Sequence, residues 1–479
     1  MARSVFLNRL PGTTRVAVAV DGRLERYLLF GDDDGPRTGD VHLGRVTSVL
    51  PSIQALFVDI GQKEPAFLNG RHLPHGWLPD PRTRVQDVVK PGRVLAVQVT
   101  RPPVGGKQVQ VSARLKLGGF WVELSEGQQG LRFSGHFSGD RDAVRQALDP
   151  LFGDADGVGL RVRSAASDRE PELVAREAGQ LIENLKRLRG TDLEGVNRRL
   201  WRPFFLETLL QEGHSDAPRA IYCDDQAFFE EVRARLAERA PSWVSRVQLH
   251  LDAIPLFDVY KITSQISEAT SPRVWLKSGG FLEIHQTEAM VTIDVNSGKN
   301  TKARGGQSGP LRTNLEAVRE GFHQIRLRQL AGLIALDLIS MKSSSDRNAV
   351  SKAIRAEIDR TDGKIDIATI DRFGIVVLAR ERRHADLTRT LMRPCPTCGG
   401  SGWSPKPESA ALDVQGHLLR DGETLRGEAL EVVAAPDLFH YLEKHRKLLF
   451  QNLEREFELE IRLVCDDRQR GARFEIRPV

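Results

Sequence analysis

Cysteine is scarce in this chain of 479 residues, which contains only four. Four thiols cannot build a disulfide framework in a chain of this length, so a disulfide-stabilised secreted scaffold is excluded. No run of about 18 apolar residues occurs, which excludes a membrane-spanning helix, and the first residues lack the apolar core of a signal peptide. We therefore expect a protein of the reducing cytoplasm.

A strong excess of either charge is also missing. The 69 Lys and Arg residues barely outnumber the 64 Asp and Glu residues, so the net charge is +5. This excess permits a polyanionic partner without requiring one. With 40% hydrophobic residues the chain is too apolar for extensive disorder. At about 100 to 200 residues per domain, its length predicts three or four folded modules.

Hydrophobic periodicity predicts the elements of the first half of the chain. Alternating apolar residues surround the Asp21-Gly22 pair and predict a β-hairpin over residues 15–30. Short β-like segments separated by turns follow over residues 42–115, as in a small β-barrel of about 80 residues. Helical spacing of apolar residues marks residues 170–189 and 224–239. Strands and amphipathic helices therefore alternate along the chain.

The second half of the chain changes pattern at Lys277. From there the order strand, strand, helix, strand predicts a βαβ unit with a buried sheet. A Gly/Ser/Pro-rich linker is expected over residues 394–407. The last segment has the pattern β-α-β-β and predicts a small closing domain.

Polar side chains end two neighbouring strands of the predicted βαβ unit. Asp294 and Asn296 end one strand, and Asp337 ends its partner. Two adjacent strands would aim these side chains at one point. Oxygen ligands of this kind suit Mg²⁺ or Mn²⁺. Each Asp could instead cap a loop or pair with an arginine, but the coincidence of two strand ends favours a metal site.

Two further segments have a composition suited to RNA. The basic, Gly-containing segment Ser297–Gly306 could lie along a phosphodiester backbone, or it could be a solvated loop. Phe57 and Phe67 lie on adjacent predicted barrel strands, and Lys107 follows them. Exposed aromatics beside a cation stack unpaired bases, each stack contributing roughly 1 to 3 kcal/mol. The alternative is that both rings belong to the barrel core.

The remaining candidates are a phosphate site and a cysteine pair. Arg163 and Ser164 end the extended run GVGLRVRS, and a guanidinium with a hydroxyl can bind a phosphate, although on the residues alone Arg163 is read as an ordinary surface residue. Cys395 and Cys398 supply two of the four ligands of a tetrahedral zinc site, so another protomer must complete it or it binds nothing.

The other two cysteines, Cys223 and Cys465, lie in apolar strand sequences. Free cysteine behaves as a small hydrophobic residue and is among the most buried residue types. Both thiols are therefore predicted to be buried.

Taken in order, the motifs resemble the ribonuclease E/G family of bacterial endoribonucleases over essentially the whole chain. The matching motifs are GRVTSVLPSIQALFVDIG with PAFL, GLRVRSA, IPLFDVYKITSQI, EAMVTIDVNSG, NLEAVREGFHQIRLRQLAGLIALDLISM, DRFG from Asp371, and CPTCGGSG. The chain ends soon after the small closing unit, which resembles the ribonuclease G type.

The resemblance implies a mixed α+β and α/β multidomain fold. An RNase H-like layer is interrupted by an S1 (OB-fold) β-barrel and a 5′-sensor, and a DNase I-like layer, a zinc-link and a small β-α-β-β domain follow. The implied domains are the first RNase H-like segment (1–35), the S1-like barrel (36–118), the 5′-sensor region (119–208), the second RNase H-like segment (209–276), the DNase I-like catalytic domain (277–394), the zinc-link (395–407) and the small domain (408–479).

The resemblance also implies roles for the metal-binding candidates. Asp294 and Asp337 would hold Mg²⁺ (or Mn²⁺), and Asn296 would orient one of them or the scissile phosphate. Cys395 and Cys398 would share one Zn²⁺ with the same pair of a second subunit. The implied assembly is a homodimer or a higher oligomer.

The RNA-binding candidates receive roles in the same way. Phe57, Phe67 and Lys107 would hold single-stranded RNA, and Arg163 with Ser164 would bind the 5′-monophosphate. The implied activity is Mg²⁺-dependent endonucleolytic hydrolysis of single-stranded RNA in rRNA maturation and mRNA turnover. The products carry 5′-phosphate and 3′-hydroxyl ends, and a 5′-monophosphate stimulates cleavage.

The sequence departs from the family pattern in three places. Ser164 stands where the family has Thr and keeps the hydroxyl. The segment from Asp337 to Met341 has Ser340 where the family commonly has a second acid, and Arg132 is not securely aligned with the family's Ser-Arg-Arg run. The missing acid supports an alternative, a non-catalytic RNA-binding or RNA-chaperoning protein. A third hypothesis is a zinc-linked assembly factor of a ribonucleoprotein.

Overall fold

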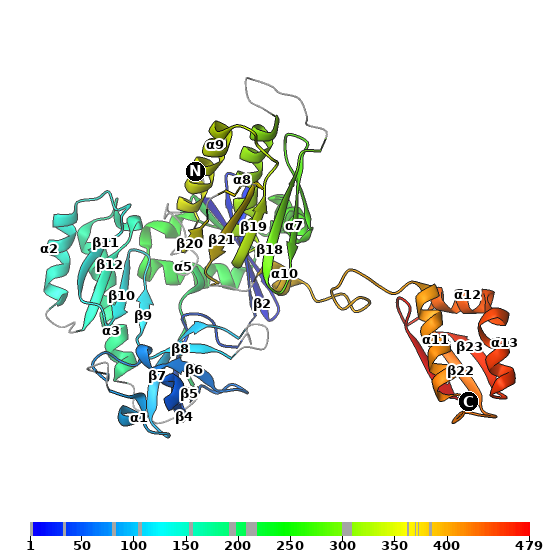
Figure 1. Ribbon diagram of the computed structural model, residues 1–479. Coiled ribbons are helices and arrows are strands. Elements are labelled where there is room, and N and C mark those ends of the chain that lie inside the picture. The colour runs from blue at the N-terminus through cyan, green and yellow to red at the C-terminus, as the bar shows by residue number, and fades with distance from the viewer. Residues whose placement is uncertain are drawn as a thin grey trace. The chain divides into compact units, whose positions relative to one another are not determined.

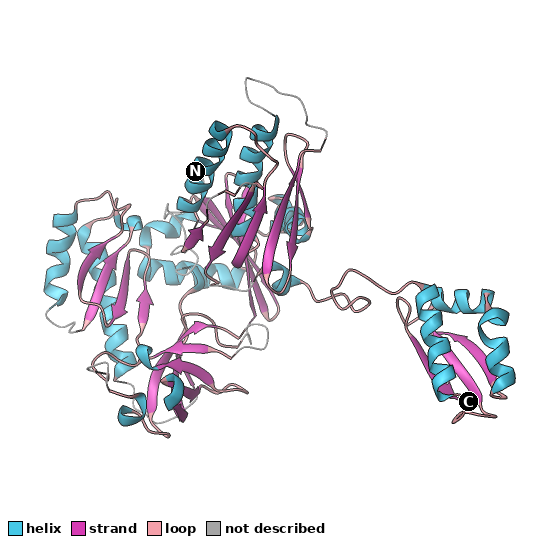
Figure 2. Cartoon of the chain, in the orientation of Figure 1, coloured by secondary structure: helices cyan, strands magenta, loops and turns pink. Residues whose placement is uncertain are grey.

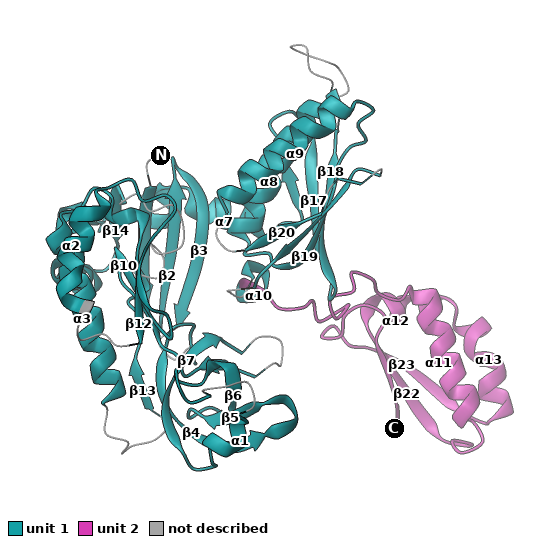
Figure 3. Cartoon of the chain, turned by 60° about the vertical axis from the view of Figure 1, so that its left-hand side comes forward, with its two compact units in different colours: residues 1–390 teal, residues 391–479 magenta. Residues whose placement is uncertain are grey.

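The computed structural model of the chain comprises two compact units, residues 1–390 (unit 1) and 391–479 (unit 2), coloured separately in Figure 3. The residues it describes are 3–31, 35–78, 83–103, 108–152, 157–190, 198–206, 218–298, 309–361, 364–368, 370–371, 373–382 and 386–479. Strands and helices alternate in both units (Figures 1 and 2). The predicted mixed α/β multidomain class is confirmed, whereas the domain boundaries and the names of the layers stay predictions.

The first sheet of unit 1 joins segments that are far apart in the sequence. Its strand order is β15 (Val247–Leu249), β14 (Ala220–Cys223), β1 (Arg3–Leu10), β2 (Thr13–Val20) and β3 (Arg23–Gly31). The predicted hairpin is β2–β3, and its turn places Asp21 at φ 49° and Gly22 at φ 80°. These left-handed conformations suit the twist of a two-residue hairpin turn. Helix α5 (Gln226–Arg239) follows β14, close to its predicted position.

The predicted β-barrel is confirmed as a closed barrel of five strands. These are β4 (Val41–Leu50), β5 (Ala55–Asp59), β6 (Ala66–Asn69), β8 (Gln110–Ser112) and β7 (Val94–Arg101), and β7 pairs back onto β4. The short helix α1 (Val85–Val88) contacts β4, and β13 (Arg198–Trp201) pairs antiparallel with the first residues of β4 in addition to the barrel pairings. Closure leaves the barrel strands without a free hydrogen-bonding edge.

A four-stranded sheet follows the barrel along the chain. Its order is β11 (Gly130–Phe133), β12 (Val158–Val162), β10 (Val122–Glu126) and β9 (Lys116–Gly118). Helices α2 (Arg141–Phe152) and α3 (Pro171–Arg189) pack with it, and α3 coincides with the predicted helix. Glu177 of α3 is only 6% exposed and accepts hydrogen bonds from the backbone N–H groups of Phe120, Trp121 and Val122. This buried carboxylate ties α3 to the start of β10.

The last sheet of unit 1 has six strands and two distinct faces. Its order is β16 (Arg273–Trp275), β17 (Phe281–Gln286), β18 (Met290–Asn296), β19 (Gly332–Asp337), β21 (Ile375–Arg380) and β20 (Ile365–Ile367). Helices α8 (Gly309–Leu327) and α9 (Ser344–Asp359) lie against one face (Figure 3), where Ile293, Leu336 and Phe322 share a core. The opposite face, called the open face below, carries the alternate residues of each strand.

Unit 2 is a three-stranded sheet with three helices. Its strand order is β23 (Glu460–Cys465), β22 (Ala429–Ala434) and β24 (Phe474–Pro478), and its helices are α11 (Pro407–Asp421), α12 (Pro436–Lys444) and α13 (Arg446–Glu456). The predicted β-α-β-β pattern is incomplete, because α11 precedes the first strand and the expected single helix breaks at His445. The exposed second half of α11 weakened its apolar periodicity.

The structure corrects one cysteine prediction. Cys223 is buried as expected, but Cys465 is exposed. It is the last residue of β23, which is an edge strand of the sheet in unit 2. The apolar sequence around Cys465 indicates the strand correctly and does not reveal that its end is open to solvent.

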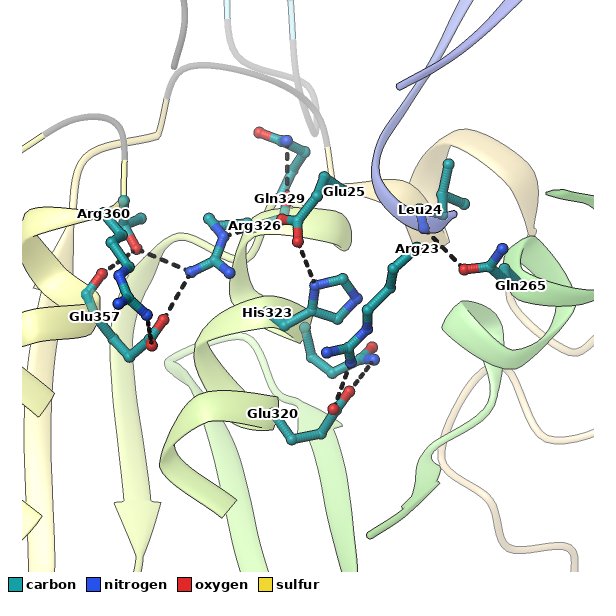
Figure 4. Close-up of polar contacts among 12 residues, drawn as sticks. Arg23, Leu24, Glu25, Gln265, Glu320, His323, Arg326, Gln329, Glu357 and Arg360 are labelled. Atoms are coloured by element: carbon teal, nitrogen blue, oxygen red, sulfur yellow. Dashed lines mark hydrogen bonds and ion pairs between the residues drawn. The ribbon is translucent and has the colours of Figure 1, made fainter. Parts of the chain in front are cut away.

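A network of ion pairs joins the first sheet of unit 1 to helix α8 (Figure 4). Glu25 of β3 lies 3.1 Å from Nδ1 of His323 and 3.2 Å from Nε of Arg326. Nη1 of Arg326 also lies 3.3 Å from Oε2 of Glu357 in α9, and Nη1 of Arg360 lies 3.0 Å from Oε1 of the same carboxylate. These contacts outweigh the burial of Glu25, which alone would raise its pKa, and lower the pKa to about 2.

We expect Glu25→Gln to reduce the free energy of unfolding of unit 1 by about 1 to 3 kcal/mol at pH 7, because a partly buried charge pair loses one partner. The folded-state pKa of Glu25 is about 2, below the ordinary value of 4.5. The stabilisation is therefore complete above pH 4.5 and is lost as the pH falls toward 2. Urea unfolding of both proteins at several pH values measures this difference.

Asp142→Asn serves as the control, because the Asp142–Arg145 pair on α2 is exposed, with 92% and 53% of the side chains accessible. Exposed pairs of this kind contribute about 0 to 1 kcal/mol. A stability difference for Glu25→Gln that stays constant between pH 7 and pH 3 would contradict the role assigned to this network.

Candidate active site

The two predicted carboxylates meet across adjacent parallel strands. Strand β18 pairs with β19 so that Asp294 stands directly opposite Asp337. Both side chains are exposed on the open face, because Ile293, Val295 and Leu336 point into the core on the other side. The placement inferred from the two strand ends is therefore present, and the pair is accessible to a substrate.

Asn296 joins this pair from the end of the same strand. Its Nδ2 donates a hydrogen bond to Oδ2 of Asp294 at 2.9 Å. The backbone of the neighbouring turn packs tightly against it, since a Cβ atom at Gly280 would lie 2.5 Å from the carbonyl oxygen of Asn296. Glycine at this position therefore allows the close approach that fixes Asn296.

A third carboxylate acts on the pair from the segment before β21. Burial raises the pKa of Asp337, and the negative charges of Asp294 and Asp371 raise it further. Asp371 accepts hydrogen bonds from the backbone N–H groups of Phe373 and Ile375 at 2.9 and 2.8 Å, which fixes its position. The sequence indicates Asp371 only as part of the DRFG motif, because Asp294 and Asp337 are far from it along the chain.

A buried amide holds the loop after Asp337. Asn314 of α8 is fully buried, accepts a hydrogen bond from the backbone N–H of Ile339 at 3.0 Å and donates one to its carbonyl oxygen at 2.8 Å. This clamp fixes the chain immediately after β19. No sequence pattern indicates this pair of hydrogen bonds, because a single Asn within an amphipathic helix does not form a recognisable motif.

The donor set fits a hard divalent cation. Two carboxylates and an amide oxygen match the one or two carboxylates that Mg²⁺ takes from a protein beside water and phosphate. Burial is the largest cause of the raised pKa of Asp337, and the charges of Asp294 and Asp371 raise it further; a cation would relieve that charge repulsion. Within the described ranges, no group of three or more His, Cys, Asp or Glu side chains is arranged to hold a metal ion.

The aromatic candidates lie together on the barrel. Phe57 of β5 pairs directly with Phe67 of β6, and their ring centroids are 6.2 Å apart at 70°. Both residues are half-buried, whereas their neighbours Leu56, Val58 and Leu68 are buried in the barrel core. The two rings therefore occupy the outer surface of the barrel. Lys107, the third candidate of this group, lies outside the described residues, as do residues 299–306 of the basic loop.

The predicted phosphate-binding arginine is held by a carboxylate. Arg163 follows β12, and its Nη2 lies 3.0 Å from Oε2 of Glu123, while Nζ of Lys116 lies 2.8 Å from the other oxygen. The side chains of Arg163 and Glu123 are largely buried, and Ser164 begins a short 3₁₀ helix beside them. Glu123 was not predicted, because it alternates within an ordinary strand pattern. Arg132 pairs in register with Arg161 of β12, so it lies on the same sheet.

The cysteine pair lies in a tight turn of unit 2. The backbone N–H of Gly399 bonds to the carbonyl oxygen of Cys395, and that of Gly402 points at Sγ of Cys398 at 3.3 Å. Hydrogen bonds from the backbone of Cys398 and Thr397 lower the pKa of Cys395 to about 7. Thiolate character suits a zinc ligand, and one chain supplies two of the four ligands required.

Comparison with known proteins identifies the family. The model of the ribonuclease E/G family matches residues 117–383, which is more than half of the chain. The chain belongs to the ribonuclease E/G family. A second model, for the ribonuclease E/G thioredoxin-like domain, matches residues 394–479, which include most of unit 2. Family membership makes the chain an endoribonuclease, as the sequence predicted.

Individual relatives agree with this result. Ribonuclease G of Haemophilus influenzae is 28% identical over 456 residues, which cover 92% of both chains. Ribonuclease G of Escherichia coli K12 is 27% identical and covers 91% of each chain. Ribonuclease E of Haemophilus influenzae is 27% identical over 96% of this chain, and the match spans 50% of that relative. Among the described residues of the ribonuclease E/G chain, no helix is long and apolar enough to cross a membrane.

We expect iodoacetamide at pH 7 to alkylate Cys395 before Cys465 and Cys223 when chelator is present. Its pKa of about 7 makes a large fraction thiolate, the reactive form, whereas partial desolvation and the neighbouring aspartates raise the pKa of Cys465 and burial raises that of Cys223 to about 12. Peptide mass spectrometry after short reaction times measures the order. Labelling of Cys465 as fast as that of Cys395 would contradict the assigned environments.

Proposed function

We propose that the chain is a Mg²⁺-dependent endoribonuclease that cleaves single-stranded RNA in rRNA maturation and mRNA turnover, with Asp294 and Asp337 at its centre. The observation that carries the proposal is the direct register pairing of these two carboxylates on an accessible sheet face. Hydrolysis at this centre would leave 5′-phosphate and 3′-hydroxyl ends.

Each residue of the centre has a distinct task in this proposal. Asp294 and Asp337 hold Mg²⁺, and the hydrogen bond from Asn296 fixes the rotamer of Asp294. Bound Mg²⁺ would supply charge neutralisation and activation of water for in-line attack on the phosphate. The negative charge of Asp371 adds to the burial that raises the pKa of Asp337. A cation bound between Asp294 and Asp337 would offset this unfavourable concentration of negative charge. Asn314 keeps the segment after Asp337 in place.

The barrel supplies the proposed path of the RNA strand. Phe57 and Phe67 present adjacent, half-exposed rings on its surface, and stacking of unpaired bases on such rings contributes roughly 1 to 3 kcal/mol each. Stacking needs exposed base faces, which favours single-stranded over paired RNA. Lys107 would add a charge contact to the backbone.

The four-stranded sheet supplies the proposed 5′-end site. Arg163 and Ser164 would receive a 5′-monophosphate, and Lys116 lies close enough to share the charge. Glu123 pairs with both cations, so a phosphate must compete with this carboxylate. We therefore propose that Glu123 limits the stimulation by a 5′-monophosphate in this chain.

The cysteine turn supplies the proposed subunit link. Cys395 and Cys398 would bind one Zn²⁺ together with the same pair of a second chain, which gives a homodimer. Because bound thiolates are protected from alkylation, added Zn²⁺ should slow the labelling of Cys395. Protection and a doubled molar mass by light scattering should appear together.

Asp294→Asn and Asp337→Asn should each lower the cleavage rate of single-stranded RNA by at least about 100-fold, because each removes a charged metal ligand. RNA affinity should change little, since neither substitution removes an aromatic ring on which a base could stack. Gel-resolved cleavage with Mg²⁺ and filter binding in EDTA measure the two quantities separately.

Asp366→Asn is the matched control, because Asp366 is an exposed carboxylate of the same sheet that pairs in register with Ala379 and by charge with Lys364. It should cleave like the wild type. Full activity of Asp294→Asn, or an equal loss of cleavage and binding in both variants, would refute the proposed centre.

Glu123→Gln should increase the ratio of cleavage rates on 5′-monophosphate and 5′-hydroxyl RNA severalfold, because the amide competes less strongly for Arg163 than a carboxylate does. Arg163→Ala should bring that ratio close to one. Single-turnover assays with both substrates measure it. A ratio that neither substitution changes would exclude this site as the 5′-end sensor.

A further inference from the structure

An exposed aromatic pair occupies the edge of the six-stranded sheet. Trp275 of β16 is 65% exposed, whereas the other tryptophans among the described residues of unit 1 are buried or half-buried. Its ring contacts that of Phe281 in β17 at a centroid distance of 5.3 Å and an angle of 60°. A large apolar surface is therefore presented to solvent at this edge of the sheet.

The register places this pair beside the proposed catalytic centre. Trp275 stands opposite Phe281, and Phe281 stands opposite Asn296. Residues that face each other across strands share a sheet face, so both rings project from the open face with Asp294. At a strand spacing of about 4.8 Å, Trp275 lies about 10 Å from Asn296.

A cation fixes the two rings in position. The guanidinium of Arg273 lies 4.5 Å from the ring centre of Phe281 and 5.9 Å from that of Trp275. Its Nε donates to Oε1 of Glu283 at 2.7 Å, and Glu283 is the register neighbour of Asp294. Arg273 therefore holds the two rings in an ordered cluster. Its partner Glu283 places this cluster next to Asp294 on the sheet.

We propose that Trp275 and Phe281 form a stacking subsite for one unpaired base of the RNA strand, next to the phosphate held at Asp294 and Asp337. The inference rests on the proposed function, because it requires RNA at that centre. A strand whose phosphate lies at the carboxylates has its neighbouring bases within reach of the rings, and every base offers a π-face for stacking. The subsite would orient the strand at the scissile bond, apart from the barrel.

The test measures whether the loss of affinity caused by removing the Trp275 ring depends on the presence of one particular base. Binding of a single-stranded oligoribonucleotide is compared with binding of oligonucleotides that lack one base at successive positions, all in EDTA. Trp275→Ala should weaken binding of the intact RNA roughly tenfold. At one position, removal of the base should weaken binding to the wild-type protein by the same factor. It should cause no further loss of binding in Trp275→Ala. Trp275→Phe should retain most of the affinity.

Leu333→Ala is the matched control, because Leu333 is 46% exposed on the same face at the other end of β19. It should bind RNA like the wild type. Losses from Trp275→Ala and base removal that simply add at every position would overturn the subsite. Unchanged RNA binding with a lower molar mass by light scattering would also overturn it, since the face would then join two copies of the chain.

The failure of this inference is distinguishable from that of the proposed function. Cleavage by the wild-type protein is measured in parallel with Mg²⁺. Absence of cleavage would refute the catalytic centre, whereas cleavage without coupling between Trp275 and any base would refute the subsite alone. Near-ultraviolet circular dichroism of Trp275→Ala and Trp275→Phe shows whether the sheet edge remains folded.

Discussion

The parallel register of β18 and β19 is the constraint on which the site depends. A shift of one residue would turn Asp294 into the core and leave Ile293 on the open face, because side chains alternate along a strand. The hydrophobic alternation of both strands forbids that shift, since Ile293, Val295, Ile334 and Leu336 must remain buried. The same pattern that forms the core therefore holds two like charges together, and the charge of Asp294 adds to the burial that raises the pKa of Asp337.

Helix α8 transmits this constraint to the rest of unit 1. One side packs Phe322 into the sheet core and holds the segment after Asp337 through Asn314. The other side meets β3 through His323 and Arg326, which bind Glu25. The sheet that carries the carboxylates is thus tied to the N-terminal strands, although hundreds of residues separate them. Packing against one helix couples folding of the N-terminal sheet to the integrity of the site.

Sequence patterns predicted those elements of the structure that depend on local order. The β2–β3 hairpin, helices α3, α5 and α8, and the pairing of Asp294 with Asp337 follow from periodicity and from the βαβ crossover. Contacts between distant strands left no such signal, so Glu123 beside Arg163, Asp371 beside Asp337 and the cluster around Trp275 were missed. Exposure at element ends was equally invisible, as Cys465 shows.

We propose that Asp294 and Asp337 support metal-dependent hydrolysis in which the 3′-oxygen is the leaving group. The most direct measurement is the chemical nature of the product ends formed from a single-stranded RNA with Mg²⁺ or with EDTA. We expect internal cuts that require Mg²⁺ and leave 5′-phosphate and 3′-hydroxyl ends. Cyclic-phosphate ends, or full cleavage in excess EDTA, would contradict it.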